Sequence, residues 1–228
     1  MAFNGFGPGT IGFLHELSLN NNKAWFLENQ ERYELDLRKP AEAFIMTLGP
    51  LLAKEYPSVI FDTRRNGSGS LMRIHRDVRF AHDKRPYKEN LGIIFPLTPG
   101  KKVEVPIFYF HIETSQAFFY GGQHVFTPTV LERYRHAVDN KRTGQALEAI
   151  LGRLANQGLR SMEEPSYKRI PKEYAADHPR GGLLRQAALG VGLDLGSDEL
   201  GQPRLVDRCL AAARQMKDLM DWLLPIND

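Results

Sequence analysis

The sequence predicts an α+β protein built on one antiparallel, or mixed, sheet of about four or more strands, flanked by N-terminal and C-terminal helices. The prediction rests on hydrophobic spacing, which follows the helical period near both ends of the chain but alternates between Val59 and Tyr120. The 228 residues are 42% hydrophobic and 25% charged, as in ordinary globular domains, which excludes the disordered and low-complexity classes.

The N-terminal part is predicted to be helical. Thr10 is placed to cap a short helix, and Asn22 is placed to cap a second one. Pro40 is expected to interrupt this second helix, and apolar residues at helical spacing resume over 44–52. Gly49-Pro50 lies inside that third helical pattern and predicts a kink or an early stop.

The middle of the chain carries the predicted strands. The β-rich runs, separated by turn-forming residues, are Leu71–Phe80, Leu91–Phe95, Lys102–Ile112 and Gln116–Tyr120. In Thr98-Pro99-Gly100 the proline presets φ and the glycine accepts a positive φ. We therefore expect the second and third runs to form a hairpin.

Helices are predicted again after the strands. Thr127 is a cap residue and Pro128 suits the first position of a helix. A second helix is expected from Gly144 to Ala155, and the last one starts at Pro203 and must dock its apolar stripe on the core. Between them, residues 161–182 are rich in proline, glycine and charge, and are expected to form a loop-rich excursion.

No repeat or linker divides the sequence, so we expect a single α+β domain over residues 1–228. Cys209 is the only cysteine and cannot form an internal disulfide. No apolar run approaches the roughly 20 residues of a membrane span, and the start lacks the order of a signal peptide. The expected location is the cytoplasm, with no membrane partner.

Positive charge is concentrated in residues 62–88. Eight basic residues there stand against three acidic ones, a net of +5, whereas the whole chain carries only +3. Such a segment is the electrostatic signature of a site for a small anion or a nucleic acid. A strand edge protected by solvated charges would have the same composition, so that alternative stays open.

Alternation in the first run places its polar side chains on one face, opposite its apolar ones. Pairing with the third run would extend that polar surface. The residues that would share it are Arg73, His75, Asp77, Tyr109 and His111. They supply imidazoles, a carboxylate, a phenol and a guanidinium, the groups of acid–base and anion sites. The structural alternative is that Asp77 neutralises an arginine and His111 hydrogen-bonds in the core.

One long motif carries a family resemblance: Arg73-Ile74-His75-Arg76-Asp77-Val78-Arg79-Phe80-Ala81-His82-Asp83-Lys84-Arg85-Pro86-Tyr87-Lys88. It resembles the Arg-x-x-x-Asp-x-Arg-Phe-x-x-Asp-Lys-x-Pro-Tyr-Lys signature of the bacterial domain of unknown function 2461 family. Residues 21–26, 109–112 and 169–172 also resemble that family, although Glu173 replaces a common glycine. The resemblance implies an α+β domain in bacterial cytoplasm and no assigned activity.

The end of this motif has a physical interpretation of its own. Pro86 stiffens the chain and keeps Arg85 out of the helical region. A stiff loop with several cations could clamp a phosphate or a carboxylate, arginine as a bidentate fork and lysine as a point charge. Ion pairs such as Asp83 with Arg79 would instead hold the loop to the sheet.

Other chemistries fit less well. A metal-dependent oxygenase would use His75, Asp77 and His124, but Thr127-Pro128 opens a helix where those enzymes need a strand. We predict no metal site and assign no cofactor. Nucleic-acid binding is possible on the basic segment but is not favoured, because the excess of +3 is small for a dedicated binder.

The sequence thus predicts a basic polar pocket for an anionic small molecule bearing a phosphate or carboxylate, and leaves open whether the protein is an enzyme. As a hydrolase or transferase it would use His75 or His111 as the acid–base group and Asp77 to orient it. The predicted ligand-binding residues are Arg73, Arg76, Arg79, Asp83, Lys84, Tyr87, Lys88 and Tyr109. The alternatives are a nucleic-acid-binding protein and a structural or interaction protein with an internal ion-pair network.

Overall fold

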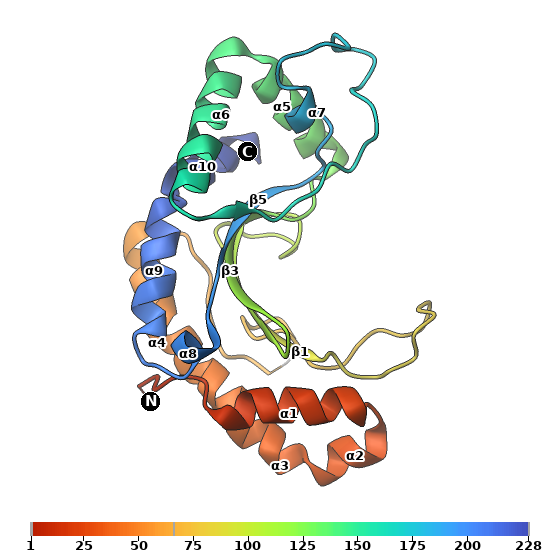
Figure 1. The fold of residues 1–228 in the computed structure, drawn as a ribbon, viewed down its shortest axis with the longest axis vertical. Coiled ribbons are helices and arrows are strands. Elements are labelled where there is room, and N and C mark those ends of the chain that lie inside the picture. Colours follow the sequence, from red (N-terminus) through yellow and green to blue (C-terminus); the bar gives the residue numbers. More distant parts are fainter. Residues whose placement is uncertain (1, 66, 228) are drawn as a thin grey trace. The chain divides into compact units, whose positions relative to one another are not determined.

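The computed structural model describes residues 2–65 and 67–227, and these confirm the α+β class, with one antiparallel sheet and helices at both termini (Figure 1). Within this part of the chain the sheet has five strands in the order β1-β2-β3-β5-β4. Their bounds are β1 Asn90–Pro96, β2 Ile107–Glu113, β3 Ala117–Gln123, β4 Arg160–Ser161 and β5 Leu189–Asp194.

The chain divides into two compact units, whose residues are interleaved along the sequence. Unit 1 comprises Met1–Phe95, Tyr109–Phe119 and Asp194–Ala211. Unit 2 comprises Pro96–Phe108, Tyr120–Leu193 and Ala212–Asp228. None of the helices in the described ranges has the length and apolar character needed to cross a membrane.

Unit 1 begins with α1 Pro8–Leu19, α2 Lys23–Glu28, α3 Gln30–Arg32, the π-helix η1 Tyr33–Arg38 and α4 Lys39–Glu55 (Figure 1). Asn22 caps α2 as predicted, because its side chain accepts a hydrogen bond from the Trp25 amide at 3.0 Å. The predicted cap at Thr10 is wrong. Helix α1 already begins at Pro8, and the Thr10 hydroxyl donates to the Asp36 carbonyl instead.

Neither predicted proline break occurs. Pro40 lies in the first turn of α4, which follows directly on the π-helix η1, so the chain stays helical through the proline. Pro50 lies inside α4, which runs on to Glu55, so the early stop is wrong. The buried face of α4, which includes Phe44 and Leu48, explains this, since packing stabilises a helix more than local propensity does.

Three of the predicted runs correspond to strands, and the first is wrong. Strands β1 and β2 are neighbours joined by a hydrogen bond from Leu97 to Pro106 at 2.9 Å, which confirms the hairpin. Within the described chain, the run Leu71–Phe80 makes two isolated bridges, Leu71 with Ile93 and His75 with Tyr87. The first bridge reaches β1, but the second joins the run to residues 86–88, so beyond Met72 the described chain pairs with itself and not with a strand of the sheet.

Strands β4 and β5 were not predicted. Glycines interrupt the β5 pattern and lower its strand propensity. The structure explains one of them, because a Cβ on Gly190 would meet the hydroxyl oxygen of Tyr120. The hydroxyl of this buried tyrosine donates to Glu163 at 3.0 Å.

The later helices are α5 Pro128–Asp139, α6 Lys141–Asn156, α7 Gly181–Leu184, α8 Ser197–Leu200, α9 Leu205–Gln215, α10 Lys217–Leu223 and the 3-10 turn η2 Leu224–Ile226. Thr127 caps α5 with Pro128 at its start, and α6 includes the helix expected from Gly144 to Ala155. The last predicted helix begins at Leu205 and is followed by α10. Residues 162–180 contain neither helix nor strand.

Candidate anion-binding site

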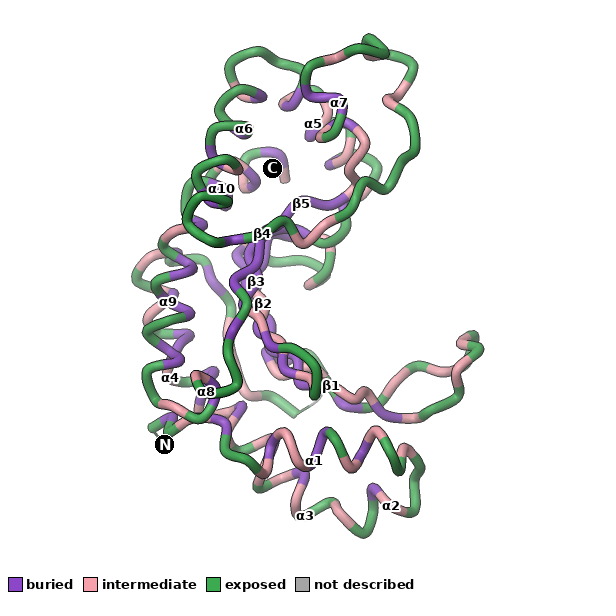
Figure 2. The backbone as a smooth tube through the Cα atoms, viewed as in Figure 1, coloured by how far each residue is buried: buried purple, intermediate pink, exposed green. Residues whose placement is uncertain are grey.

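The family motif lies on an arm that leaves the sheet beside its edge strand β1, and we define the arm as residues 70–89 (Figure 1). Its two sides are paired through the Arg76 amide and the Pro86 carbonyl at 2.8 Å. A second bond joins the Lys88 amide to the Ile74 carbonyl at 2.7 Å. Most of the arm is exposed or half-buried (Figure 2). Its polar residues therefore lie along a projecting hairpin rather than on one face of the sheet.

The base of the arm is held by the loop before α2. The Asn21 side chain donates to the Tyr87 carbonyl at 3.0 Å and accepts from the Tyr87 amide at 3.0 Å, so it replaces a strand partner. The Tyr87 ring stacks on Phe26 with 4.1 Å between centroids and also contacts His75. Sequence reasoning missed the roles of Asn21 and Phe26, although both lie in a stretch that resembles the family.

Three arginines of the arm are neutralised within it. The pairs are Arg79–Asp77 at 2.7 Å, Arg76–Asp83 at 2.7 Å, Arg85–Asp83 at 2.8 Å and Arg85–Glu89 at 2.7 Å. Hydrogen bonds from Arg85, and then from Arg76, hold the pKa of Asp83 well below its ordinary value. Lys84 donates to the Val78 carbonyl at 3.0 Å. These exposed contacts fix the shape of the arm more than they add stability.

Arg73 and Lys88 are different. Within the described part of the chain, neither side chain makes a hydrogen bond or an ion pair. Lys88 is half-buried, and burial, with the positive charge of Arg73 as the smaller cause, lowers its pKa from the ordinary value of 10.5. The charge of Arg73 is also felt by Asp77, but that carboxylate is already paired with Arg79. Arg73 and Lys88 are thus two cations that repel each other, and a bound anion would stabilise the charged form of both.

Arg73 also lines a cavity of about 240 Å³ in unit 1, together with Phe26, Tyr33 and His75. The cavity wall holds three further arginines, each paired with a carboxylate. Those pairs are Arg38–Glu42 at 2.8 Å, Arg64–Asp62 at 2.6 Å and Arg65–Glu34 at 3.4 Å. Arg73 is therefore the lining cation that has no carboxylate partner among the residues described.

A chain of hydrogen bonds runs along one face of β2. The Tyr109 hydroxyl lies 3.0 Å from His111 Nδ1, and His111 Nε2 lies 3.2 Å from Glu113. Burial lowers the pKa of His111, which favours the neutral imidazole. Nδ1 then accepts from the phenol and Nε2–H donates to the carboxylate. Burial also raises the pKa of Tyr109 to about 12.

The predicted residues thus fall into two groups, one on the arm and one on β2. In the described ranges no hydrogen bond or ion pair joins His75 or Asp77 to His111. The shared surface expected from the sequence required the first run to pair with β2, but β1 occupies that position. Asp77 orients Arg79, and His75 packs against aromatic rings.

No group of three or more His, Cys, Asp or Glu side chains is placed to hold a metal ion, so far as the chain is described. His124, a ligand in the oxygenase alternative, lies 3.3 Å from Glu163. Thr127-Pro128 opens helix α5, as the sequence indicated. Cys209 is buried, and burial raises the pKa of its thiol well above the ordinary value.

Neutral His111 gives a testable pH dependence. Its pKa is lower in the folded chain than the ordinary value of 6.5, so the unfolded chain takes up the proton first. The stability contributed by neutral His111 is therefore present above pH 6.5 and is lost as the pH falls below that value. We expect His111→Gln to flatten this part of the dependence of the unfolding free energy on pH, measured in urea. The exposed His136, changed to Gln, should leave it as in the wild type; equal curves for His111→Gln and wild type would contradict the assignment.

The fold and the arm define an α+β protein whose signature residues lie on a charged hairpin at the sheet edge. The chain belongs to the family described as "Conserved hypothetical protein (DUF2461)", whose model matches residues 9–222. This confirms the resemblance drawn from the arm motif. A search of curated proteins finds no match.

Proposed function

We propose that this protein binds a small molecule bearing a phosphate or carboxylate group, and that Arg73 and Lys88 are its principal contacts. The observation that supports this proposal is the half-buried Lys88, whose amide donates at 2.7 Å to the carbonyl of Ile74, the neighbour of Arg73. Among the described residues, neither cation has a carboxylate partner. An anion bound between Arg73 and Lys88 would neutralise them, as carboxylates neutralise Arg76, Arg79 and Arg85. Arginine would supply a bidentate fork and lysine a point charge.

Three of the other predicted ligand-binding residues have supporting roles in this proposal: Arg76, Asp83 and Tyr87. Asp83 ties together the two sides of the arm through Arg76 and Arg85. Tyr87 anchors the arm to the rest of unit 1 through Asn21. These contacts preorganise the arm, so less conformational entropy is lost when an anion binds.

Acid–base chemistry is a second candidate function, and the chain on β2 is the observation that favours it. A substrate proton would pass to the Tyr109 oxygen while Tyr109 gives its own proton to His111 Nδ1. Glu113, 3.2 Å from the other ring nitrogen, would stabilise the resulting imidazolium. This is the arrangement that hydrolysis or transfer of a phosphate or carboxylate ester would use. The pH dependence described for His111→Gln tests the neutral imidazole that it requires.

Titration calorimetry with inorganic phosphate at low ionic strength tests the binding proposal. Lys88→Met and Arg73→Met are each expected to lower the affinity at least about tenfold, because a charge-assisted hydrogen bond contributes about 1.5–3 kcal/mol. Arg79→Met is the matched control. That guanidinium is on the same arm but is paired with Asp77, so its loss should change the affinity by less than about twofold.

The Arg79→Met control also distinguishes a specific anion site from a diffuse effect of charge. An equal loss of affinity in all three variants would indicate a diffuse charge effect and contradict the proposal, as would the absence of phosphate binding to the wild type. A nucleic-acid surface would instead show preferential binding to oligonucleotides and a steep decline of affinity with salt. Melting curves of each variant establish that it is folded.

A further inference from the structure

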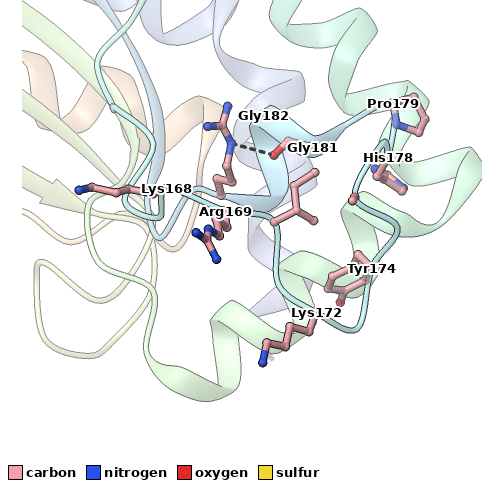
Figure 3. A pocket seen from close by; sticks show the side chains of 11 residues that line it. Lys168, Arg169, Lys172, Tyr174, His178, Pro179, Gly181 and Gly182 are labelled. Atoms are coloured by element: carbon pink, nitrogen blue, oxygen red, sulfur yellow. Dashed lines mark hydrogen bonds between the residues drawn. The ribbon is translucent and has the colours of Figure 1, made fainter.

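Unit 2 contains a larger cavity, about 800 Å³, formed by the irregular segment that precedes α7 and by α7 itself (Figure 3). Its volume is within the range of about 300–1,000 Å³ typical of small-molecule sites. Among the described residues that line it, five are lysine, arginine or histidine, and none bears a carboxylate. They are Lys168, Arg169, Lys172, His178 and Arg185.

The wall of this cavity is anchored to the end of α5. The Arg180 guanidinium is buried and donates to the Val138 carbonyl at 2.6 Å and the Asp139 carbonyl at 3.0 Å. His178, two residues before Arg180, accepts a hydrogen bond from the Arg180 amide at 3.0 Å. Its other ring nitrogen lies 3.2 Å from the Asp139 carboxylate. The position of His178 is therefore set from both sides of the ring.

The floor of the cavity is closely packed. A Cβ on Gly181 would lie 2.4 Å from the terminal methyl group of Ile170, so the irregular segment packs directly against the start of α7. Arg185 donates to the Gly181 carbonyl at 3.3 Å, drawn as the dashed line in Figure 3. The irregular segment thus packs against α7 and forms one wall of the cavity, although it has no regular secondary structure.

The lysines and Arg169 leave positive charge available for a ligand. In the described chain, Lys168, Arg169 and Lys172 form no ion pair with a carboxylate. In Figure 3 Lys168 and Arg169 lie to the left, whereas Lys172 lies beside Tyr174 and His178 lies above that tyrosine. The nearby Glu173 is found in the lining of another hollow, together with Glu132. The lining of the cavity therefore combines cationic side chains with an aromatic ring.

We propose that this cavity binds a nucleotide-sized organic phosphate, with its phosphates at Arg169 and Lys172 and its organic part against Tyr174. Arginine and lysine recognise phosphate oxygens through charge-assisted hydrogen bonds. A cavity of about 800 Å³ exceeds what a free inorganic anion would fill, and it combines apolar and cationic walls. This inference concerns residues of unit 2 and does not rest on the site proposed on the arm.

Titration calorimetry of the full chain with ADP tests the inference. Wild type is expected to bind ADP at least about tenfold more tightly than adenosine, because the phosphates carry the contact. The double variant Arg169→Ala/Lys172→Ala should lose at least about tenfold in ADP affinity. Lys141→Ala removes an exposed lysine of unit 2 outside the cavity and should leave the affinity unchanged within about twofold.

The arm variants distinguish this site from the one in unit 1. ADP affinity that falls in Arg73→Met/Lys88→Met but not in Arg169→Ala/Lys172→Ala would overturn the inference, as would equal binding of ADP and adenosine. The double variant Arg169→Ala/Lys172→Ala removes the proposed site of unit 2. Phosphate binding to the arm can then be measured separately in this variant. Failure at one site is thereby distinguishable from failure at the other.

Discussion

Arg180→Ala is expected to lower the free energy of unfolding by about 3 kcal/mol. Arg180 is only 7% exposed, and its guanidinium pairs with the Val138 and Asp139 carbonyls at the end of α5. Terminal helix carbonyls have no partner within the helix, so removing the guanidinium leaves them unsatisfied in a buried place. The variant also opens a void, because Gly144 is packed directly against the Arg180 side chain.

Urea unfolding followed by circular dichroism measures this effect. Arg142→Ala is the control, since Arg142 is an exposed arginine in α6 and its loss should cost less than about 0.5 kcal/mol. Arg180→Lys should recover only part of the loss, because an ammonium cannot reproduce the planar fork that reaches two carbonyls. If Arg180→Ala lowered the free energy of unfolding by less than about 1 kcal/mol, the Val138 and Asp139 carbonyls would have to find other hydrogen-bond donors in the variant, and this account would be contradicted.

Gly92→Ala is expected to lower the free energy of unfolding by about 2 kcal/mol. Gly92 is buried in β1, and an added Cβ would lie 2.6 Å from the Tyr109 hydroxyl oxygen and 3.1 Å from the Met72 sulfur. Tyr109 is held by its hydrogen bond to His111, so it can give way only by losing that bond. The substitution should therefore also disconnect the chain on β2.

The same unfolding experiment measures the stability, and nitrogen NMR of the imidazole reports the His111 tautomer. Gly152→Ala is the control, because no atom of the described residues lies within 4 Å of the added Cβ. In this helical position alanine should stabilise the protein by about 0.5–1 kcal/mol. Wild-type stability with the Tyr109–His111 bond intact in Gly92→Ala would contradict the packing described here.

Local patterns were sufficient for the fold class and for several helix boundaries. Asn22 and Thr127 could be predicted as N-caps because capping depends on residues that are close in sequence. The arm and β5 depend on distant contacts. Asn21 pairs with Tyr87, which is 66 residues away, and Gly190 is required by the ring of Tyr120. No window of neighbouring residues contains that information.

The candidate site was predicted in part for the same reason. Charge counting located the basic segment, but it cannot tell a neutralised cation from an available one. The alternative in which Asp77 neutralises a neighbouring arginine is what the structure shows for Arg79. Arg73 and Lys88 stand apart only when distances and burial are known. The cavity of unit 2 was not predicted, because its cations lie in an irregular segment without a periodic pattern.

The most direct test is to follow the ε-methylene resonance of Lys88 by NMR as a function of pH, with and without inorganic phosphate. An anion bound between Lys88 and Arg73 would favour the charged ammonium, so phosphate is expected to raise the pKa of Lys88 toward its ordinary value of 10.5. The rise should be absent in Arg73→Met. A Lys88 pKa that stays the same at saturating phosphate would contradict the proposal that these two residues form the anion site.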